Sequence, residues 1–310
     1  MSQITNTILM VRPIRFRMNE QTAVNNYFQE DLDVLNETVN AKAQREFDAF
    51  VEKLGAVGVN VIVVQDTENP DTPDSIFPNN WVSTHEDGTL ALYPMFAENR
   101  RLERNEDVLK ALEEEGFSIK DVMDYTAAEE EEIFLEGTGS IILDRVNRKA
   151  YCALSPRADE ELFIEFCEDF EYFPVIFTAN QSVDGQRKPI YHTNVMMCVG
   201  DDFAVICLST IDDKKERKNV VDHLKKDGKE IIDITEAQMN EFAGNMLQVQ
   251  GGDAKKYLVM SQSAHDCLTE LQKATIGKYA TILSSNLETI ETCGGGSARC
   301  MMAEIFLPKK

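Results

Sequence analysis

The chain has 310 residues, enough to bury a substantial core in one large domain or two ordinary ones. Its 31 Lys and Arg residues against 54 Asp and Glu residues give a formal net charge of -23, which disfavours nucleic acid and anionic membranes as partners. No apolar run approaches the roughly 18 residues of a membrane span, and the first residues lack the pattern of a signal peptide. We therefore expect a soluble, cytoplasmic protein that binds neither nucleic acid nor membrane.

A unit of strand, polar turn, strand and amphipathic helix recurs along the chain without linkers. Four copies have their strand pairs at 79–94, 137–156, 192–210 and 244–263, followed by helices at 100–116, 158–170, 212–228 and 264–274. A fifth copy is split: residues 298–308 supply its first strand, and residues 5–14 and 37–55 supply the rest. This pattern predicts an α/β fold in which residues 1–310 form a single domain closed by its two termini.

Five polar residues occupy the same place in the five units. Asn80, Glu136, His192, Asn245 and Cys300 each open a first strand, at separations of 56, 56, 53 and 55 residues by subtraction of their numbers. Residues in one register of a repeat take equivalent positions in the assembled fold. If the split unit joins the termini, the five residues converge at the centre, and an acid, an imidazole and a thiol meet there.

Cys300 ends the glycine-rich stretch GGGSARC, and we interpret it as a nucleophile. A thiol attacks as thiolate, which turn amides or a positive neighbour stabilise, and either Arg299 or a protonated His192 could supply that charge. The alternative is a buried cysteine after a flexible loop, as expected for most of the seven cysteines, which form no C-x-x-C pair. The register favours the nucleophile, whereas Cys293 is interpreted as a bystander.

His192 and Glu136 are the candidate partners of this thiol. An imidazole can protonate a leaving amine and then activate the hydrolytic water. The small residues after Glu136, in EGTG, leave its carboxylate free to orient the imidazole or to bind a substrate N–H. The structural alternatives are a core histidine and a surface acid in an acidic background.

These residues resemble the guanidino-group modifying enzymes of the amidinotransferase, arginine deiminase and dimethylarginine hydrolase superfamily, and most of all its citrulline utilisation hydrolases. GGGSARC resembles the family's motif around a late cysteine, HTN its H-x-D histidine motif, and EGTG its glutamate motif. The resemblance implies a five-bladed, pseudo-symmetric α/β propeller, the pentein fold. It also implies thiolate attack on the planar guanidino or ureido carbon, a covalent intermediate and its hydrolysis, with no metal or cofactor.

Two departures from the family pattern bear on the substrate. Deiminases hold a cationic guanidinium with aspartates, but here FPNN places Asn80 at the first aspartate position, with Asn79 before it, and HTN places Asn194 at the second. Each missing carboxylate would cost a buried guanidinium about 2 to 4 kcal/mol. An amide can instead accept from a ureido N–H and donate to a ureido C=O. The resemblance therefore points to hydrolysis of citrulline to ornithine, carbon dioxide and ammonia.

The carboxylate of an amino-acid substrate needs a guanidinium fork. Arg157 in LSPRAD resembles the arginine that serves deiminases in this way, and Arg100 or Arg101 could be a second clamp. For all three the structural alternative is a surface residue at the start of a helix.

Several alternatives remain at this stage. A deiminase or dimethylarginine hydrolase would act on a cationic guanidino substrate, and an amidinotransferase would pass the same intermediate to an amine. A non-enzymatic propeller, as in a ribosome-binding initiation factor, would have no reactive centre and suits the strong negative charge poorly. The partner that we expect is a small amino-acid substrate, and the sequence leaves a homo-oligomer open.

Overall fold

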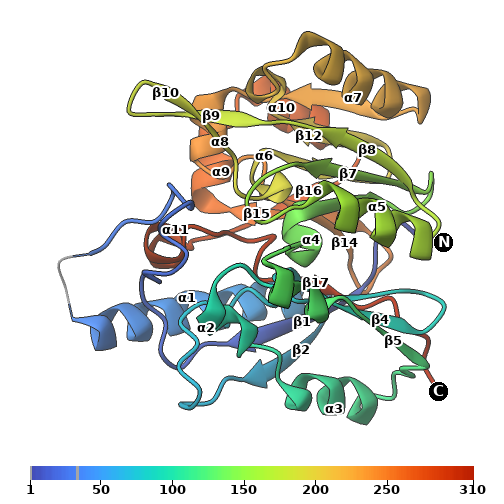
Figure 1. The fold of residues 1–310 in the computed structure, drawn as a ribbon. Helices are drawn as coiled ribbons and strands as arrows, with labels where there is room; N and C mark the ends of the chain where they lie inside the picture. Colours follow the sequence, from blue (N-terminus) through green and yellow to red (C-terminus); the bar gives the residue numbers. More distant parts are fainter. Residues whose placement is uncertain (1, 33–34) are drawn as a thin grey trace.

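The computed structural model describes residues 2–32 and 35–310. Within them, strands form five three-stranded sheets of one topology and a separate hairpin (Figure 1). The first two strands of each sheet are antiparallel, and the third is parallel to the second. In chain order the sheets are β3 (Val82–Thr84), β4 (Thr89–Leu92) and β5 (Asp121–Asp124); β6 (Ile141–Asp144), β7 (Lys149–Ala153) and β8 (Phe173–Phe177); β11 (Met197–Val199), β12 (Phe203–Ile206) and β13 (Glu230–Asp233); β14 (Leu247–Gln250), β15 (Lys256–Ser261) and β16 (Thr281–Ser285); and β17 (Ala303–Glu304), β1 (Thr7–Arg12) and β2 (Asn60–Gln65).

Helices connect the second strand of each sheet to the third, as parallel strands require. These crossover helices are α3 (Glu106–Glu114), α5 (Glu160–Asp169), α7 (Lys214–Lys226), α10 (Glu270–Ile276) and α1 (Asn36–Ala56). The remaining elements are short: α2 (Glu98–Arg101), α4 (Gly137–Ser140), α6 (Thr193–Met196), α8 (Glu236–Asn240), α9 (Gln262–Cys267), α11 (Glu288–Gly294), the 3-10 helices η1 (Pro78–Asn80), η2 (Thr126–Glu131) and η3 (Leu208–Thr210), and the hairpin β9 (Asn180–Val183) and β10 (Gln186–Pro189). Figure 1 shows α7 and α3 at opposite ends of the molecule.

The expected α/β units are present, but their strands and helices differ from the prediction in two ways. Each unit has a third strand after its helix, which the strand-turn-strand-helix pattern did not include. The helices expected at 100–116 and 264–274 are each two helices, α2 with α3 and α9 with α10. The last of these breaks is explained by Thr269, which caps a new helix and so ends the preceding one.

The predicted joining of the termini is confirmed at the level of one sheet. β1, near the N-terminus, pairs antiparallel with β17, near the C-terminus, and parallel with β2. The first strand of this unit is much shorter than the predicted 298–308, because residues 298–301 form a turn. Among the first strands, β3 contacts β17, β6 contacts β11, and β11 contacts β14. The closure of all five sheets into a propeller stays a prediction.

In the described part of the chain, no helix is both long and apolar enough to cross a membrane. Buried apolar side chains gather in clusters between the sheets and their helices, as in the group around Phe47, Phe50 and Ile290 that packs α1 against α11. This packing holds rigid the chain segments that precede the first strands, where the predicted site residues lie.

Candidate active site

The five residues that share one position in the repeat units lie in short helical turns and loops just before the first strands, not in the strands themselves. Asn80 ends η1, Glu136 and His192 are the N-cap residues of the one-turn helices α4 and α6, and Asn245 and Cys300 lie in turns just before β14 and β17. All five side chains are buried. Asn80, His192 and Cys300 line one cavity, and Glu136 and Asn245 contact residues of its wall. The predicted convergence of these five residues is therefore present.

The cavity is nearly closed. Only about 10 Å³ is open to the centre of a water molecule, which leaves room for about one water. Part of its wall is the glycine turn at 294–296, where a Cβ on Gly296 would lie 2.9 Å from the ring of Phe77. The Tyr191 hydroxyl donates to the carbonyl of Gly295 and ties this turn to the residue before His192. A wider groove of about 730 Å³ beside Tyr27 and Glu291 holds none of the predicted site residues.

Glu136 and His192 form the expected acid and imidazole pair. Oε2 of Glu136 lies 2.6 Å from Nε2 of His192, and Oε1 accepts from the backbone N–H of Phe96 at 3.0 Å. Burial alone would raise the pKa of Glu136, but Arg157 and His192 hold it well below its ordinary value. Burial lowers the pKa of His192 to about 4, although Glu136 opposes the shift. At neutral pH an ionised Glu136 therefore accepts from a neutral imidazole, whose Nδ1 is free to take a proton.

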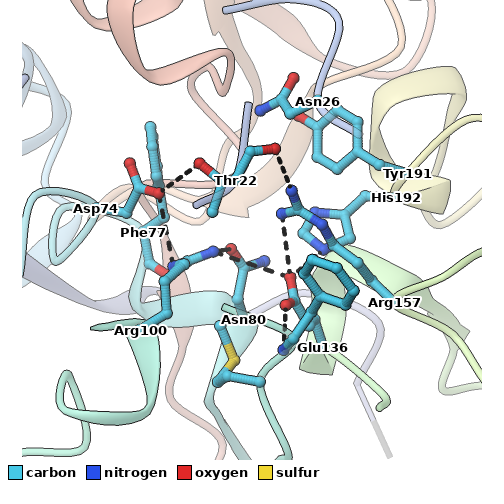
Figure 2. Close-up of polar contacts among 12 residues, drawn as sticks. Thr22, Asn26, Asp74, Phe77, Asn80, Arg100, Glu136, Arg157, Tyr191 and His192 are labelled. Carbon is cyan, nitrogen blue, oxygen red and sulfur yellow. Dashed lines mark hydrogen bonds and ion pairs between the residues drawn. The ribbon is translucent and has the colours of Figure 1, made fainter. Parts of the chain in front are cut away.

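Arg157, the predicted carboxylate-binding arginine, is buried in the cavity wall with its guanidinium beside Glu136. Its Nη1 lies 3.5 Å from Oε2 of Glu136, and its Nη2 donates to the carbonyl of Thr22 at 2.9 Å (Figure 2). Its Nε donates to Oδ1 of Asn25 at 2.9 Å. The ring of Tyr191 lies 4.9 Å from its central carbon. The N-terminal segment thus covers the guanidinium from one side.

Arg100 is also buried at the cavity, but most of its N–H groups are already bound. Nε and Nη2 donate to the two oxygens of Glu103, each at 2.9 Å, and Nη2 also donates to the carbonyl of Phe77. Nη1 donates to Oδ1 of Asn80 at 2.8 Å (Figure 2). Arg100 therefore orients Asn80. Arg101 lies partly exposed with its Nε bound to the carbonyl of Met95, and it is not among the described residues that line the cavity.

Two amides surround the thiol of Cys300. Nδ2 of Asn245 lies 3.2 Å from Sγ, and Nδ2 of Asn194 lies 3.4 Å from it. The two sources of positive charge that we expected are placed differently. The guanidinium of Arg299 donates to the carbonyl of Met302 and to Glu304, and His192 is neutral. The backbone N–H of Arg299, rather than its side chain, takes part through a bond to Asn245.

Four buried polar atoms at the site have no partner within the described chain: Oδ1 of Asp74, Oδ1 of Asn79, Nδ2 of Asn80 and Oδ1 of Asn194. An unpaired buried donor or acceptor costs about 1 to 3 kcal/mol. Asp74 and Asn80 line the cavity and Asn194 contacts Sγ of Cys300, so two acceptors and one donor are placed to meet a bound molecule. Asn79 itself donates to Thr138 at 3.3 Å and is not among the cavity-lining residues.

Sequence reasoning missed four contributors to this site. Asp74 lines the cavity, Glu103 binds Arg100, and Thr22 and Asn25 bind Arg157. Asp74 lies in an acidic stretch and Glu103 in a segment of mixed charge, both of which look like solvated surface, and Thr22 and Asn25 lie outside the repeat units. The register could find only residues at equivalent positions in the units.

Comparison with known proteins identifies the family. The sequence model of N,N-dimethylarginine dimethylhydrolase, eukaryotic, matches residues 12–307. The chain belongs to this family. It is thus one of the guanidino-group modifying hydrolases of the pentein superfamily, enzymes that act on non-peptide C–N bonds. No curated protein matches the sequence of this family member.

Solved structures of this fold include an arginine dihydrolase, ArgZ, from the ornithine-ammonia cycle in Cyanobacteria, with 18% identity and a TM-score of 0.73. The match covers 98% of this chain but only 41% of that one, so the chain spans about two fifths of the length of ArgZ. The N-terminal domain of ArgZ bound to substrate matches with 17% identity and a TM-score of 0.73, covering 96% of this chain and 97% of that one. A dimethylarginine dimethylaminohydrolase adduct has 13% identity, a TM-score of 0.66, and coverage of 97% and 100%. These likenesses support the mixed α/β pentein fold.

Proposed function

We propose that this hydrolase cleaves a ureido amino acid, with citrulline and water as substrates and ornithine, carbon dioxide and ammonia as products. The observation that carries the proposal is the orientation of Asn80. Arg100 donates to its Oδ1 at 2.8 Å, so its Nδ2 faces the site as an unpaired donor. A ureido carbonyl oxygen can accept from this N–H. A guanidinium has only donors and would leave it unpaired, at a cost of about 1 to 3 kcal/mol.

Asn194 presents the opposite polarity. Its Nδ2 is directed at Sγ of Cys300, which leaves its buried Oδ1 as a free acceptor. A ureido NH₂ can donate to this oxygen while the ureido oxygen accepts from Asn80. One donor and one acceptor on the two amides match the C=O and NH₂ of a neutral ureido group, and this pairing would hold the reacting carbon at the thiol.

The rest of an amino-acid substrate also finds complementary groups. Arg157 supplies a buried guanidinium for a carboxylate, once its contacts with Thr22 and Asn25 are exchanged for the ligand. Oδ1 of Asp74 is an unpaired acceptor on the same cavity and suits an α-ammonium group. The closed cavity implies that the N-terminal segment around Thr22 moves to admit the substrate.

In the proposed mechanism His192 takes the proton of the Cys300 thiol, the thiolate so formed attacks the ureido carbon, and His192 passes the proton to the departing amine. The carbon stays bonded to Sγ as a thiocarbamate. Water, deprotonated by His192, then attacks this carbon and displaces the thiolate, and the resulting carbamic acid releases carbon dioxide and the second amine. Glu136 keeps the imidazole oriented throughout through its bond to Nε2.

Arginine is the second candidate substrate. The arginine dihydrolase ArgZ shares the fold, and the free acceptors on Asn194 and Asp74 suit cationic N–H donors better than the Asn80 donor does. Cleavage of arginine to ornithine would need two successive hydrolyses at one thiol, the second of them on the ureido group. We favour citrulline because only its carbonyl oxygen satisfies Asn80.

We further propose that the five sheets form a closed, pseudo-symmetric propeller and that residues 1–310 make one domain. The shared topology of the sheets, the contacts between their first strands and the pairing of β1 with β17 support this arrangement. The cytoplasmic location and the oligomeric state stay predictions from the sequence.

Product analysis by mass spectrometry tests the function, with citrulline, arginine and dimethylarginine supplied separately. We expect ornithine from citrulline, little or no product from the other two, and no turnover by a folded Cys300→Ala variant. Ornithine from arginine would establish the dihydrolase, and citrulline from arginine or dimethylarginine would establish a deiminase or dimethylarginine hydrolase. Turnover by Cys300→Ala would contradict the covalent mechanism.

Asn80→Asp tests the role of the amide donor. It replaces the free N–H with a carboxylate oxygen, so kcat/KM for citrulline should fall at least tenfold, or about 1.4 kcal/mol, while binding of arginine improves. Asn240→Asp makes the same change on an exposed side chain and should leave both values unchanged. Equal activity of Asn80→Asp and the parent protein on citrulline would rule out the proposed donor.

A further inference from the structure

The immediate surroundings of Sγ of Cys300 are amides. Asn245 and Asn194 are both fully buried, and each directs Nδ2 at the sulfur, at 3.2 Å and 3.4 Å. A thiolate accepts hydrogen bonds much more strongly than a neutral thiol because it carries a full charge. Two N–H donors aimed at one sulfur therefore favour its anionic form.

Within the described residues, the side chains that donate to this sulfur are amides, and no cation is among them. Arg299, the preceding residue, has its guanidinium bound to the carbonyl of Met302 at 2.7 Å and to Glu304 at 2.9 Å. His192 lines the same cavity but is neutral at physiological pH. The side-chain amides of Asn245 and Asn194 are therefore the groups that can stabilise the Cys300 thiolate.

Asn245 is fixed in the orientation that this role needs. Its Oδ1 accepts from the backbone N–H of Arg299 at 2.9 Å, so its NH₂ group must face the other way. One N–H donates to the carbonyl of Asn194 at 3.1 Å, and the other is left for Sγ. Each donor and acceptor of the amide is thus used, and none is left for a substrate. Asn194 differs because its Oδ1 is free.

We propose that Asn245 is a catalytic residue whose side-chain N–H stabilises the thiolate of Cys300 in place of a cation. The proposal rests on Cys300 being the nucleophile of the proposed function. Asn245 and Asn194 then have different roles. Asn245 is a fixed donor to the sulfur, and Asn194 joins the sulfur to the substrate. The backbone bond from Arg299 couples Asn245 to the turn that carries Cys300, so donor and acceptor keep their distance.

The test measures alkylation of Cys300 by iodoacetamide as a function of pH, with the modified peptide quantified by mass spectrometry. In Asn245→Ala the midpoint of the rate profile should move up by at least one pH unit, which lowers the rate at pH 7 by about tenfold. A residue with a purely structural role would not move this midpoint. Circular dichroism and thermal unfolding check that the variant is folded.

Two further variants complete the experiment. Asn245→Asp keeps the oxygen that accepts from Arg299 but replaces the NH₂ with an oxygen, so its midpoint should rise more than that of Asn245→Ala. It also decides the question should Asn245→Ala not fold. Asn240→Asp adds the same charge on an exposed side chain five residues earlier and should match the parent protein. A parental midpoint in a folded Asn245 variant would overturn the proposal.

The alkylation assay uses no substrate, so this inference and the proposed function fail separately. A parental profile in the Asn245 variants, with citrulline turnover intact in the parent protein, would overturn only the role of Asn245. Retained turnover by Cys300→Ala would instead show that Cys300 is not the nucleophile. A shift in the alkylation profile would then have no bearing on catalysis.

Discussion

At the residue scale, the site depends on asparagine side chains whose amide orientation is fixed by hydrogen bonds from neighbouring residues. Arg100 binds Oδ1 of Asn80, and the N–H of Arg299 binds Oδ1 of Asn245, so each Nδ2 has a defined direction. An asparagine without such a neighbour could present either end. The specificity that we propose therefore lies as much in Arg100 as in Asn80.

Gly139 shows how closely the backbone of α4 approaches these groups. A Cβ there would lie 2.4 Å from Nδ2 of Asn80 and 2.8 Å from Nδ1 of His192. We expect Gly139→Ala to displace both side chains, lower kcat/KM at least tenfold and cost about 1 to 3 kcal/mol of stability. Steady-state kinetics and urea unfolding measure the two effects.

The control is Gly55→Ala. A Cβ on Gly55, in α1, would meet no heavy atom within 4 Å, so this variant should keep its activity and gain up to about 1 kcal/mol of stability. Parental activity in Gly139→Ala would show that the close contacts at this glycine do not constrain catalysis.

At the element scale, side-chain caps decide where most crossover helices begin. Asn105, Asp159 and Asp213 cap α3, α5 and α7, and Thr269 caps α10 with a complete capping box, whereas α1 has no side-chain cap. These caps satisfy the first backbone N–H groups of each helix. None of these caps is among the described residues that line the cavity, so we expect them to support the fold without taking part in the reaction.

Thr269→Ala tests this separation of stability from activity. Thr269 Oγ1 accepts from the N–H of Gln272, and Gln272 Oε1 accepts from the N–H of Thr269. Loss of the cap should cost about 1 kcal/mol in urea unfolding and leave kcat/KM unchanged. Thr275→Ala removes a hydroxyl from the same helix without removing a cap, and it should be neutral or slightly stabilising. Equal stability of the two variants would contradict the capping argument.

At the scale of the whole molecule, the sheet of β17, β1 and β2 joins the two ends of the chain directly after Cys300. Glu304 in β17 also binds the guanidinium of Arg299. The three residues that follow, Ile305 to Leu307, are buried. The position of the nucleophile therefore depends on contacts between segments some 300 residues apart in sequence.

Removal of residues 303–310 should consequently abolish activity. The loss of three buried apolar side chains alone costs about 5 kcal/mol or more, which is comparable to the whole stability of many domains. Removal of only Lys309 and Lys310, which are exposed, should preserve both folding and turnover. Thermal unfolding and citrulline turnover measure the outcome, and a stable, active product of the longer truncation would show that β17 is dispensable.

The sequence by itself determined the repeating units, the pairing of its terminal segments and the register of Asn80, Glu136, His192, Asn245 and Cys300. It could do so because strand and helix periodicity are local properties, and equivalent positions in repeats are equivalent in space. The third strand of the first unit, Asp121–Asp124, escaped this reasoning because it is short and polar.

Only the tertiary structure decided how these residues are used. In the folded protein the guanidinium of Arg299 binds the carbonyl of Met302 and not Cys300, and Arg100 binds Glu103 and Asn80. Asp74 lines the cavity, and Thr22 and Asn25 bind Arg157 in its wall. The direction of a side chain, and which atoms of an amide stay unpaired, depend on neighbours from distant segments. No local pattern encodes that choice, because it is made by hydrogen bonding and burial once the chain has folded.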